Sequence, residues 1–137
     1  MKFKLNLHSL KIMEQIAKFR FKNYIITYTN ININPYKDVS KNIKLNIQRL
    51  EEHELRNNTY CIRLSVHIRN ENDSLNILTE FLGNFEYDPE LTDEEKSIYF
   101  KHNAPAILMP YIRAYVSSIT SLSGIPTIVL PTYNFLV

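Results

Sequence analysis

Glycine is scarce in this sequence, with two in 137 residues, and tryptophan is absent. Two glycines cannot build a glycine-rich phosphate loop or a G-x-S-x-G nucleophile elbow, and neither motif occurs. Cys61 is the only cysteine, which excludes a disulfide framework and a cysteine metal site. Because Cys61 lies within an apolar stretch, we expect a buried, unreactive thiol in a reducing compartment.

The sequence also lacks the residue patterns of metal and acid–base sites. None of its four histidines stands in an HExxH motif or a comparable ligand spacing. Glu51, Glu52 and Glu54 surround His53 at the end of a predicted strand and near a turn, where we expect a solvated loop. Nothing places an acid beside a base or activates a nucleophile. We therefore predict a protein that is not an enzyme and that needs no metal or other cofactor.

Strong net charge and long apolar runs are missing as well. The net charge of +2 is too small to suggest a nucleic-acid binder. Basic and aromatic residues alternate in Lys18, Phe19, Arg20, Phe21 and Lys22. Such a pattern can bind single-stranded nucleic acid. The two-residue period of a β-strand with one solvated face explains it equally well. No N-terminal apolar segment resembles a signal peptide, and no run is long enough for a membrane span. We expect a cytoplasmic protein with no nucleic-acid partner and no membrane insertion.

The composition that remains, 45% hydrophobic and 22% charged, is that of a soluble globular domain. Apolar residues at helical spacing predict a short amphipathic helix from Ser9 to Lys18, too short to be stable unless it packs on something. We therefore divide the chain into an N-terminal helical extension, residues 1–18, and a single domain, residues 19–137.

Four strands are predicted after this extension. β-Branched and aromatic residues dominate from Phe19 to Ile33, and Ile43 to Gln48 alternates between apolar and polar residues. Tyr60 to Arg69 has the cleanest alternation, which indicates one buried and one wetter face. The fourth strand runs from Leu75 to Tyr87, and Gly83 within it suggests a bulge or a close approach of another backbone.

Helices follow the strands. Thr92 and Glu95 form a capping box that opens a short helix reaching about Lys101. We expect Asn103-Ala104-Pro105 to end that helix and to start a long one, from about Ala106 to Leu122, which Ser123-Gly124 terminates. The predicted fold class is α+β: a four-stranded antiparallel sheet followed by a short and a long helix, with an extra short N-terminal helix.

The aromatic residues, nine Tyr and seven Phe, gather mainly in the fourth strand and the helices. They can simply fill a core. A one-layer sheet with one long helix, however, leaves the second face of the sheet poorly covered, so such a domain either assembles with itself or exposes an apolar groove. Both outcomes point to binding and not to catalysis.

Three segments together resemble the SecB family of protein-export chaperones. Asn103 to Arg113, NAPAILMPYIR, is similar to the segment that opens the family's long helix, with an apolar run and then Pro-Tyr-x-Arg. Gly124 to Phe135 resembles its post-helix turn and Leu-x-Pro-x-Asn-Phe region, and Glu80 to Phe85 resembles the Gly-x-Phe end of its last strand. The likeness covers Leu75 to Phe135, and before that only the order of elements agrees.

The resemblance implies a holdase for unfolded or pre-secretory polypeptides, assembled as a homo-oligomer, either a dimer or a tetramer. Its partners would be unfolded clients and either the SecA motor or an antitoxin. The implied client groove is lined by Phe81, Phe85, Tyr87, Tyr111 and Tyr115, although the period does not decide whether Phe81 and Phe85 face a groove or the core. The implied oligomer interface uses the small residues Ala114, Ser117, Ser118 and Ser121.

Two departures from the family narrow this expectation, and the first is the extra N-terminal helix, Ser9 to Lys18, which its best-known members lack. The sequence stops shortly after Asn134-Phe135, so we expect a short member without the family's second long helix and acidic tail, which puts SecA binding in question. Short members occur in toxin–antitoxin systems, and a dedicated antitoxin chaperone is the first alternative. The second alternative is a structural or assembly protein that uses the same fold without clients.

Overall fold

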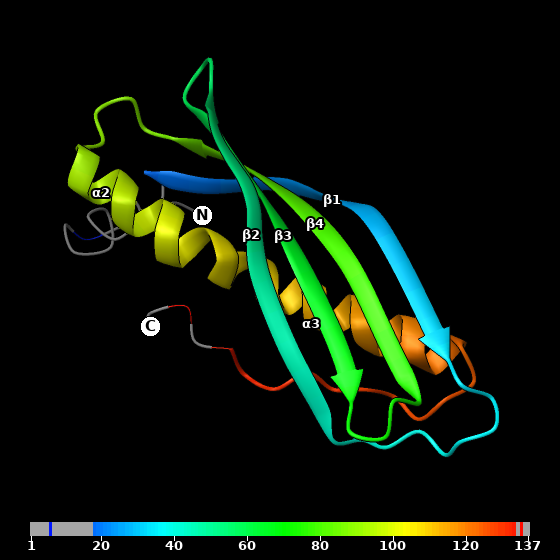
Figure 1. The fold of residues 1–137 in the computed structure, drawn as a ribbon. Helices are drawn as coiled ribbons and strands as arrows, with labels where there is room; N and C mark the ends of the chain where they lie inside the picture. The colour runs from blue at the N-terminus through cyan, green and yellow to red at the C-terminus, as the bar shows by residue number, and fades with distance from the viewer. Residues whose placement is uncertain (1–5, 7–17, 134, 136–137) are drawn as a thin grey trace, which may run out of the picture.

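The structure is a computed structural model that describes residues 6, 18–133 and 135. The helix predicted from Ser9 lies outside these residues up to position 17, so the N-terminal extension stays a prediction. The single domain predicted after it begins with the first strand, as Figure 1 shows.

All four predicted strands are confirmed and form one antiparallel sheet in the spatial order β1-β4-β3-β2. β2, β3 and β4 follow one another as hairpins, whereas residues 34–42 carry the chain from β1 across the ends of β4 and β3 to β2 (Figure 1). This is a Greek-key arrangement, and it leaves β1 and β2 as the two edges. The strands are β1 (Phe19–Ile33), β2 (Ile43–Leu55), β3 (Thr59–Asn70) and β4 (Leu75–Tyr87).

Asparagine side chains hold the crossing segment against the β3–β4 turn. Asn70 donates from Nδ2 to the Ser40 carbonyl over 3.1 Å and to Ser74 Oγ over 2.6 Å. Asn72 donates to the Asp38 carbonyl over 2.8 Å. Because these amides satisfy loop carbonyls that have no ladder partner, the long connection is tied to the sheet without adding a strand.

The helical region differs from the prediction in one respect. α2 (Asp93–Ile98) begins with the predicted capping box, and α3 (Ala104–Leu122) ends before Gly124, whose φ is 82°. The expected break at Asn103-Ala104-Pro105 is wrong, because the π-helical segment η1 (Tyr99–Asn103) joins the two helices without interruption. The Ala104 N–H bonds to the Tyr99 carbonyl five residues earlier, so the backbone stays helical up to the proline.

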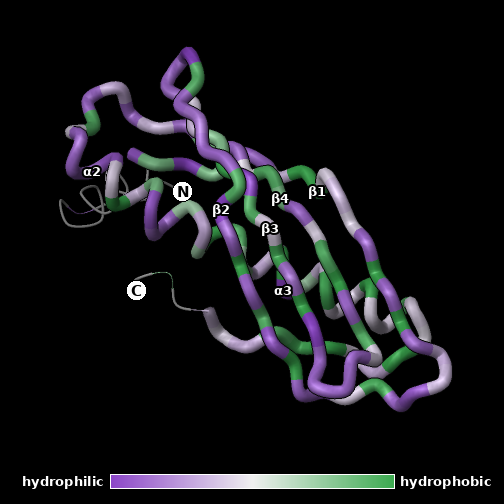
Figure 2. The backbone as a smooth tube through the Cα atoms, viewed as in Figure 1, coloured by the Kyte–Doolittle hydropathy of each residue, from purple (hydrophilic) through white to green (hydrophobic). Residues whose placement is uncertain are grey.

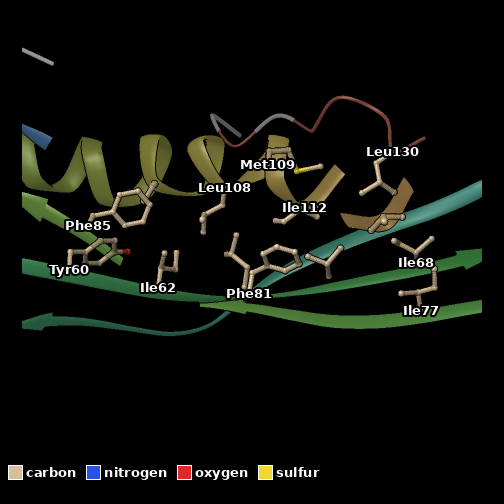
Figure 3. Close-up of a cluster of buried hydrophobic side chains, with 14 of the residues drawn as sticks. Tyr60, Ile62, Ile68, Ile77, Phe81, Phe85, Leu108, Met109, Ile112 and Leu130 are labelled. Atoms are coloured by element: carbon tan, nitrogen blue, oxygen red, sulfur yellow. The ribbon is translucent and has the colours of Figure 1, made fainter. Parts of the chain in front are cut away.

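The core lies between one face of the sheet and the helix. Hydrophilic and hydrophobic residues alternate along the strands in Figure 2, and the apolar set faces α3. Figure 3 shows the cluster, in which Leu108 and Ile112 point down onto the strands. Burial of each large side chain in this cluster contributes about 1.5–3 kcal/mol. The fully buried side chains include Tyr60, Ile62, Leu64, Ile68, Ile77, Phe81, Phe85, Leu108, Ile112 and Leu130.

A side chain of α3 lies against the β4 backbone at Gly83, where the sequence suggested a bulge or a close approach. A Cβ atom at Gly83 would lie 2.7 Å from Leu108 Cδ1 and 2.8 Å from Leu108 Cδ2, closer than real Cβ contacts. Leu108 is fully buried and cannot swing into solvent. The absent side chain at position 83 therefore sets the height and the line of α3 above β4.

We predict that Gly83→Ala lowers the free energy of unfolding by about 1–3 kcal/mol, because the added methyl overpacks Leu108. In a Leu108→Ala background the same substitution should cost less, with a coupling energy of about 1 kcal/mol. Urea unfolding of the wild type, both single variants and the double variant measures this coupling. Strictly additive effects would mean that Gly83 and Leu108 do not set the packing of α3.

The start of β1 is fastened to the start of α2. Lys18 Nζ lies 3.2 Å from Glu95 Oε2, and the Lys18 carbonyl accepts a hydrogen bond from the Asp88 N–H over 2.8 Å. The hydrogen bond from the Thr92 backbone N–H and the Lys18 ammonium together hold the pKa of Glu95 below its usual value. The Glu95 carboxylate in turn raises the pKa of Lys18. A carboxyl group whose folded pKa is lowered stabilises the fold above its unfolded pKa and loses that effect as pH falls through the folded value.

We expect Glu95→Gln to lower the melting temperature at about pH 7, and this difference to shrink as the pH falls through the lowered folded-state pKa of Glu95. The glutamine keeps the capping-box acceptor and removes only the charge. Glu94→Gln, in the same helical turn, is the matched control for the helix dipole and should show a smaller pH-dependent difference. Thermal unfolding across this pH range checks the prediction, and equal curves for the two variants would contradict it.

Candidate binding groove

β2 is the strand that the helix covers least. α3 packs against β1, β3 and β4. The inward-facing residues of β2 are only partly buried, whereas those of β3 beside them are inaccessible to solvent. Because an inward face without a helix above it leaves apolar surface open, a binding site is expected under this edge. The partly buried residues of β2 are Ile43, Leu45 and Ile47.

Two adjoining cavities lie there, between β2 on one side and α2, η1 and the C-terminal segment on the other. We call them together the β2 groove. Arg49 and Lys101 line both cavities and separate them. The first has a volume of about 520 Å³ and is lined by Arg49, Glu52, His53, Glu54, Tyr60, Ser97, Phe100 and Lys101. The second has a volume of about 490 Å³ and is lined by Ile47, Gln48, Arg49, Leu64, Lys101, Tyr133 and Phe135.

Stacked aromatic rings form the floor of the first cavity. The Tyr60 and Phe100 rings lie 3.9 Å apart at an angle of 3°. The Tyr60 hydroxyl donates to Glu52 Oε1 over 2.5 Å. Burial of the phenol, reinforced by the Glu52 carboxylate, raises the pKa of Tyr60, so the hydroxyl stays protonated and holds Glu52 in place. Tyr60 itself is 2% exposed, so Phe100 supplies the apolar surface of this floor, with charged groups at its rim.

Arg49 joins β2 to the π-helical turn. Pro105 has no N–H, so it cannot donate to the carbonyl of Lys101 four residues earlier or of Phe100 five residues earlier. The Arg49 guanidinium donates to both carbonyls, to Phe100 over 3.2 and 3.3 Å, and also bonds to Glu52. The Arg49 side chain thus supplies hydrogen-bond donors to the helical carbonyls and holds its own position between the two cavities.

The glutamate cluster of β2 is part of the strand and not of a loop. The expected solvated loop around His53 is wrong, because the whole segment Glu51 to Glu54 pairs with β3. Alternation sends Glu52 and Glu54 inward to the groove, and Glu51 and His53 to the opposite face. Glu54 Oε2 lies 3.5 Å from Lys96 Nζ on α2, which balances its charge at the rim.

The five predicted groove residues do not form one accessible surface. Phe81 and Phe85 are fully buried and Tyr87 is 5% exposed, so in this structure they belong to the core beneath the helix (Figure 3). Tyr111 and Tyr115 lie on α3 over β1, at the opposite edge from the β2 groove. The question that strand periodicity left open is therefore answered: the sheet face that carries Phe81 and Phe85 is covered.

Tyr111 and Tyr115 take part in a separate aromatic cluster. The Tyr111 ring lies 5.2 Å from Phe21 and 4.9 Å from Tyr24, with 39% of the residue exposed. The Tyr115 hydroxyl is 2.8 Å from Thr29 Oγ1 on β1. These contacts hold α3 over the β1 edge, and they give both tyrosines a packing role within the chain.

The four predicted interface residues fall into two groups. Ala114 and Ser118 are exposed on the outer side of α3. Ser117 Oγ donates to the Ile128 carbonyl over 3.0 Å, and Ser121 Oγ bonds to Thr127 Oγ1 over 2.6 Å. The second pair therefore binds the chain's own C-terminal segment.

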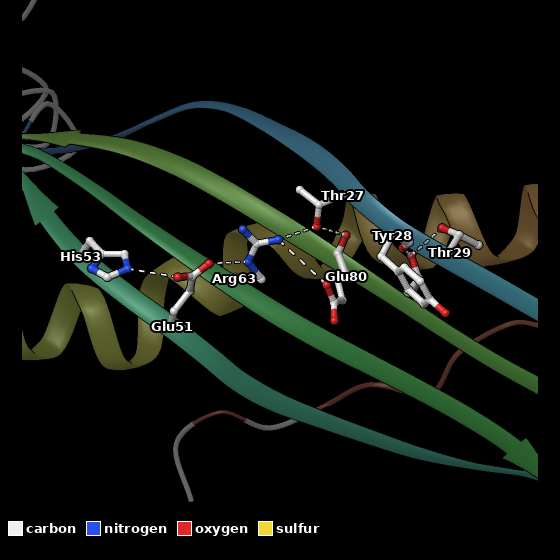
Figure 4. A network of polar contacts seen from close by, with 8 residues as sticks. Thr27, Tyr28, Thr29, Glu51, His53, Arg63 and Glu80 are labelled. Carbon is white, nitrogen blue, oxygen red and sulfur yellow. Dashed lines mark hydrogen bonds and ion pairs between the residues drawn. The ribbon is translucent and has the colours of Figure 1, made fainter.

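The outer face of the sheet is polar. Figure 4 shows Arg63 between Glu51, 2.5 Å away, and Glu80, 3.9 Å away, with Thr27 also bonded to the guanidinium. The Arg63 guanidinium, followed by His53 at 3.1 Å, lowers the pKa of Glu51. These ion pairs cross three strands on the side away from α3, where Ile25 and Tyr28 of β1 are also exposed.

The described residues contain no cluster of three or more His, Cys, Asp or Glu side chains that could hold a metal ion. Cys61 is buried as expected, and burial raises the pKa of its thiol. Within the same part of the chain, no helix is long and apolar enough to span a membrane.

Arg49 and the inward face of β2 were not predicted from the sequence. The period-two pattern carried a signal for Arg49, which follows the inward positions Ile43, Leu45 and Ile47. Glu54 faces inward only because the register shifts between Arg49 and Glu51. Inward charge at one end of an edge strand indicates a face that the core does not fully cover.

The comparisons with known proteins include a solved structure of the same fold. No model of a known protein family matches this chain. A protein of Methanocaldococcus jannaschii, "Uncharacterized protein MJ0357", is 27% identical over 122 residues, covering 84% of this chain and 78% of that protein. The SecB-like chaperone Rv1957 of Mycobacterium tuberculosis, solved in complex with a ChAD peptide from the Rv1956 HigA1 antitoxin, superposes with a TM-score of 0.70. That match is 19% identical and covers 94% of this chain and 100% of Rv1957.

The chain therefore has the SecB-like fold, an α+β fold in which a four-stranded antiparallel sheet is followed by a long helix. This confirms the fold that the resemblance of Leu75 to Phe135 predicted. It extends the likeness to β1, β2 and β3, where the sequence offered only the order of the elements.

We predict that Arg49→Ala destabilises the protein by about 1–3 kcal/mol, because it leaves the carbonyls of Phe100 and Lys101 without donors. In a Pro105→Ala background the cost should be smaller, since the restored N–H can reach one of these carbonyls. Urea unfolding of the two singles and the double variant measures the difference. An equal cost in both backgrounds would show that Arg49 does not compensate for the proline.

Proposed function

We propose that this protein is a SecB-like chaperone that holds segments of non-native polypeptide in the β2 groove. The observation that carries the proposal is an uncovered inner edge of the sheet, with two adjoining cavities, in a chain that has the fold of a chaperone solved with a peptide. The protein is not an enzyme on this account, since its task is to delay folding and aggregation of the bound chain.

The chemistry of the groove suits an extended segment with alternate apolar side chains. The partly buried Phe100 and Ile47 offer apolar surface in the two cavities, whose lining also includes the buried Tyr60 and Leu64. Burial of a client's apolar side chains contributes roughly 25 cal/mol per Å². The free edge of β2 adds backbone donors and acceptors for a strand-like client. Several such weak contacts on one client combine through effective concentration.

A dedicated chaperone of a toxin–antitoxin system is the second candidate. It is favoured by the antitoxin peptide bound to the Rv1957 chaperone, whose fold this chain shares. On this account one antitoxin segment is the client, and unrelated unfolded proteins bind weakly. A neighbouring toxin–antitoxin gene pair favours this candidate, whereas suppression of aggregation of several unrelated proteins favours a general holdase with a role in protein export.

Self-assembly is part of the proposal. Ala114 and Ser118 are small and exposed on α3, which allows a second helix to approach closely. We propose that this side of α3 forms the interface of a dimer or tetramer in the cytoplasm. Native mass measured on the sample used for client binding separates the alternatives: a stable oligomer that holds no unfolded chain would favour a structural protein and contradict both chaperone functions.

We expect Ile47→Glu to weaken binding of an unfolded, carboxymethylated protein at least tenfold, because the charge would lie inside the groove. Asn46→Glu is the matched control, since the neighbouring residue of β2 pairs with His67 on the polar outer face. It should bind within about twofold of wild type. Isothermal titration of the folded variants decides, and equal affinities for both variants would remove the β2 groove as the client site.

A further inference from the structure

The segment after α3 is held like a bound peptide. It runs back alongside the helix as extended chain (Figure 1) and, among the described residues, makes no backbone–backbone hydrogen bond beyond Gly124. Side chains of α3 bind its backbone instead: Thr120 Oγ1 accepts from the Ile128 N–H over 3.0 Å, and Ser117 Oγ donates to the Ile128 carbonyl.

The two halves of this segment are held differently. Ile128 and Leu130 are 2% and 1% exposed and belong to the core, so the first half is a fixed part of the fold. Tyr133 and Phe135 are only partly buried. The bond from His102 Nδ1 to the Phe135 carbonyl, 2.8 Å long, is the one side-chain hydrogen bond to the described residues of this second half.

Empty space flanks the two rings on both sides. Tyr133 and Phe135 lie 4.7 Å apart between ring centroids. Both line the 490 Å³ cavity on the β2 side and a further cavity of about 190 Å³ beside Met109 and Arg113 of α3. Protein interiors are normally close-packed, so rings with a cavity on either side have few contacts to lose when they move.

We propose that Tyr133 and Phe135 are a displaceable occupant of the β2 groove, which a client must replace in order to bind. This inference rests on the proposed function and concerns the regulation of the same site. Withdrawal of the two rings joins the cavities of about 490 Å³ and 190 Å³ that flank them into one groove between β2 and α3. Because only the open form binds, the apparent dissociation constant of a client equals its intrinsic value divided by the open fraction. The core anchors at Ile128 and Leu130 keep the fold intact while the rings leave.

The absence of tryptophan provides a direct reporter. In a Phe135→Trp variant, the probe is reduced, carboxymethylated ribonuclease A, an unfolded chain without tryptophan. Its addition should shift the emission of the introduced indole to longer wavelength as the ring enters solvent. Val129→Trp, at a position that is 68% exposed in the anchored half, is the control and should not respond. Binding of the probe without any change at position 135 would overturn the inference and leave the proposed function standing.

Affinity gives the second test. The Tyr133→Ser/Phe135→Ser double variant should bind the same probe about tenfold more tightly than wild type, because no ring has to leave. Val129→Ser should bind as wild type does, and circular dichroism confirms that all variants are folded. Unchanged or weaker binding by the double variant would make the rings part of the client-binding wall and contradict the proposal. Binding by neither protein would instead remove the proposed function, and the inference with it.

Discussion

The close approach of α3 to β4 at Gly83 is the constraint on which the rest of the structure depends. Because a single helix covers a sheet of four strands, its position decides which strand stays open. Leu108 rests on the bare backbone of Gly83, and Tyr111 and Tyr115 hold the helix toward β1. The inner face of β2 is left without a helix above it, and the same contact that fixes the core therefore creates the groove.

The two prolines of the helical region have opposite consequences. Pro110 lies within α3 and the helix continues past it. Pro105 removes one helical donor, and Arg49 reaches across from β2 to bind the carbonyls of Phe100 and Lys101. A local defect in the helix is thereby converted into a tertiary contact that sets the wall between the two cavities. Arg49 both lines the groove and stabilises the helical region. We therefore expect a substitution in the groove to alter the helix, and a substitution in the helix to alter the groove.

Much of the fold could be predicted because its signals are local. Strand alternation, the Thr92 capping box and the glycine after α3 each depend on a few neighbouring residues. The site could not be predicted in the same way. Period two placed Phe81 and Phe85 on one face, but only the position of α3 decides that this face is buried. The prediction of a helix break at Asn103-Ala104-Pro105 was wrong for a similar reason. Arg49, which binds the carbonyls of the π-helical turn, is distant from it in sequence.

The central claim is that non-native chains bind under β2, between the strand and the helix. Hydrogen exchange of the protein with and without a bound unfolded polypeptide tests it most directly. The account predicts slower exchange of amides in β2 and η1 on binding, with the β1 edge and its tyrosine cluster unchanged. Protection confined to β1, or no protection anywhere in a protein that does bind the polypeptide, would contradict it.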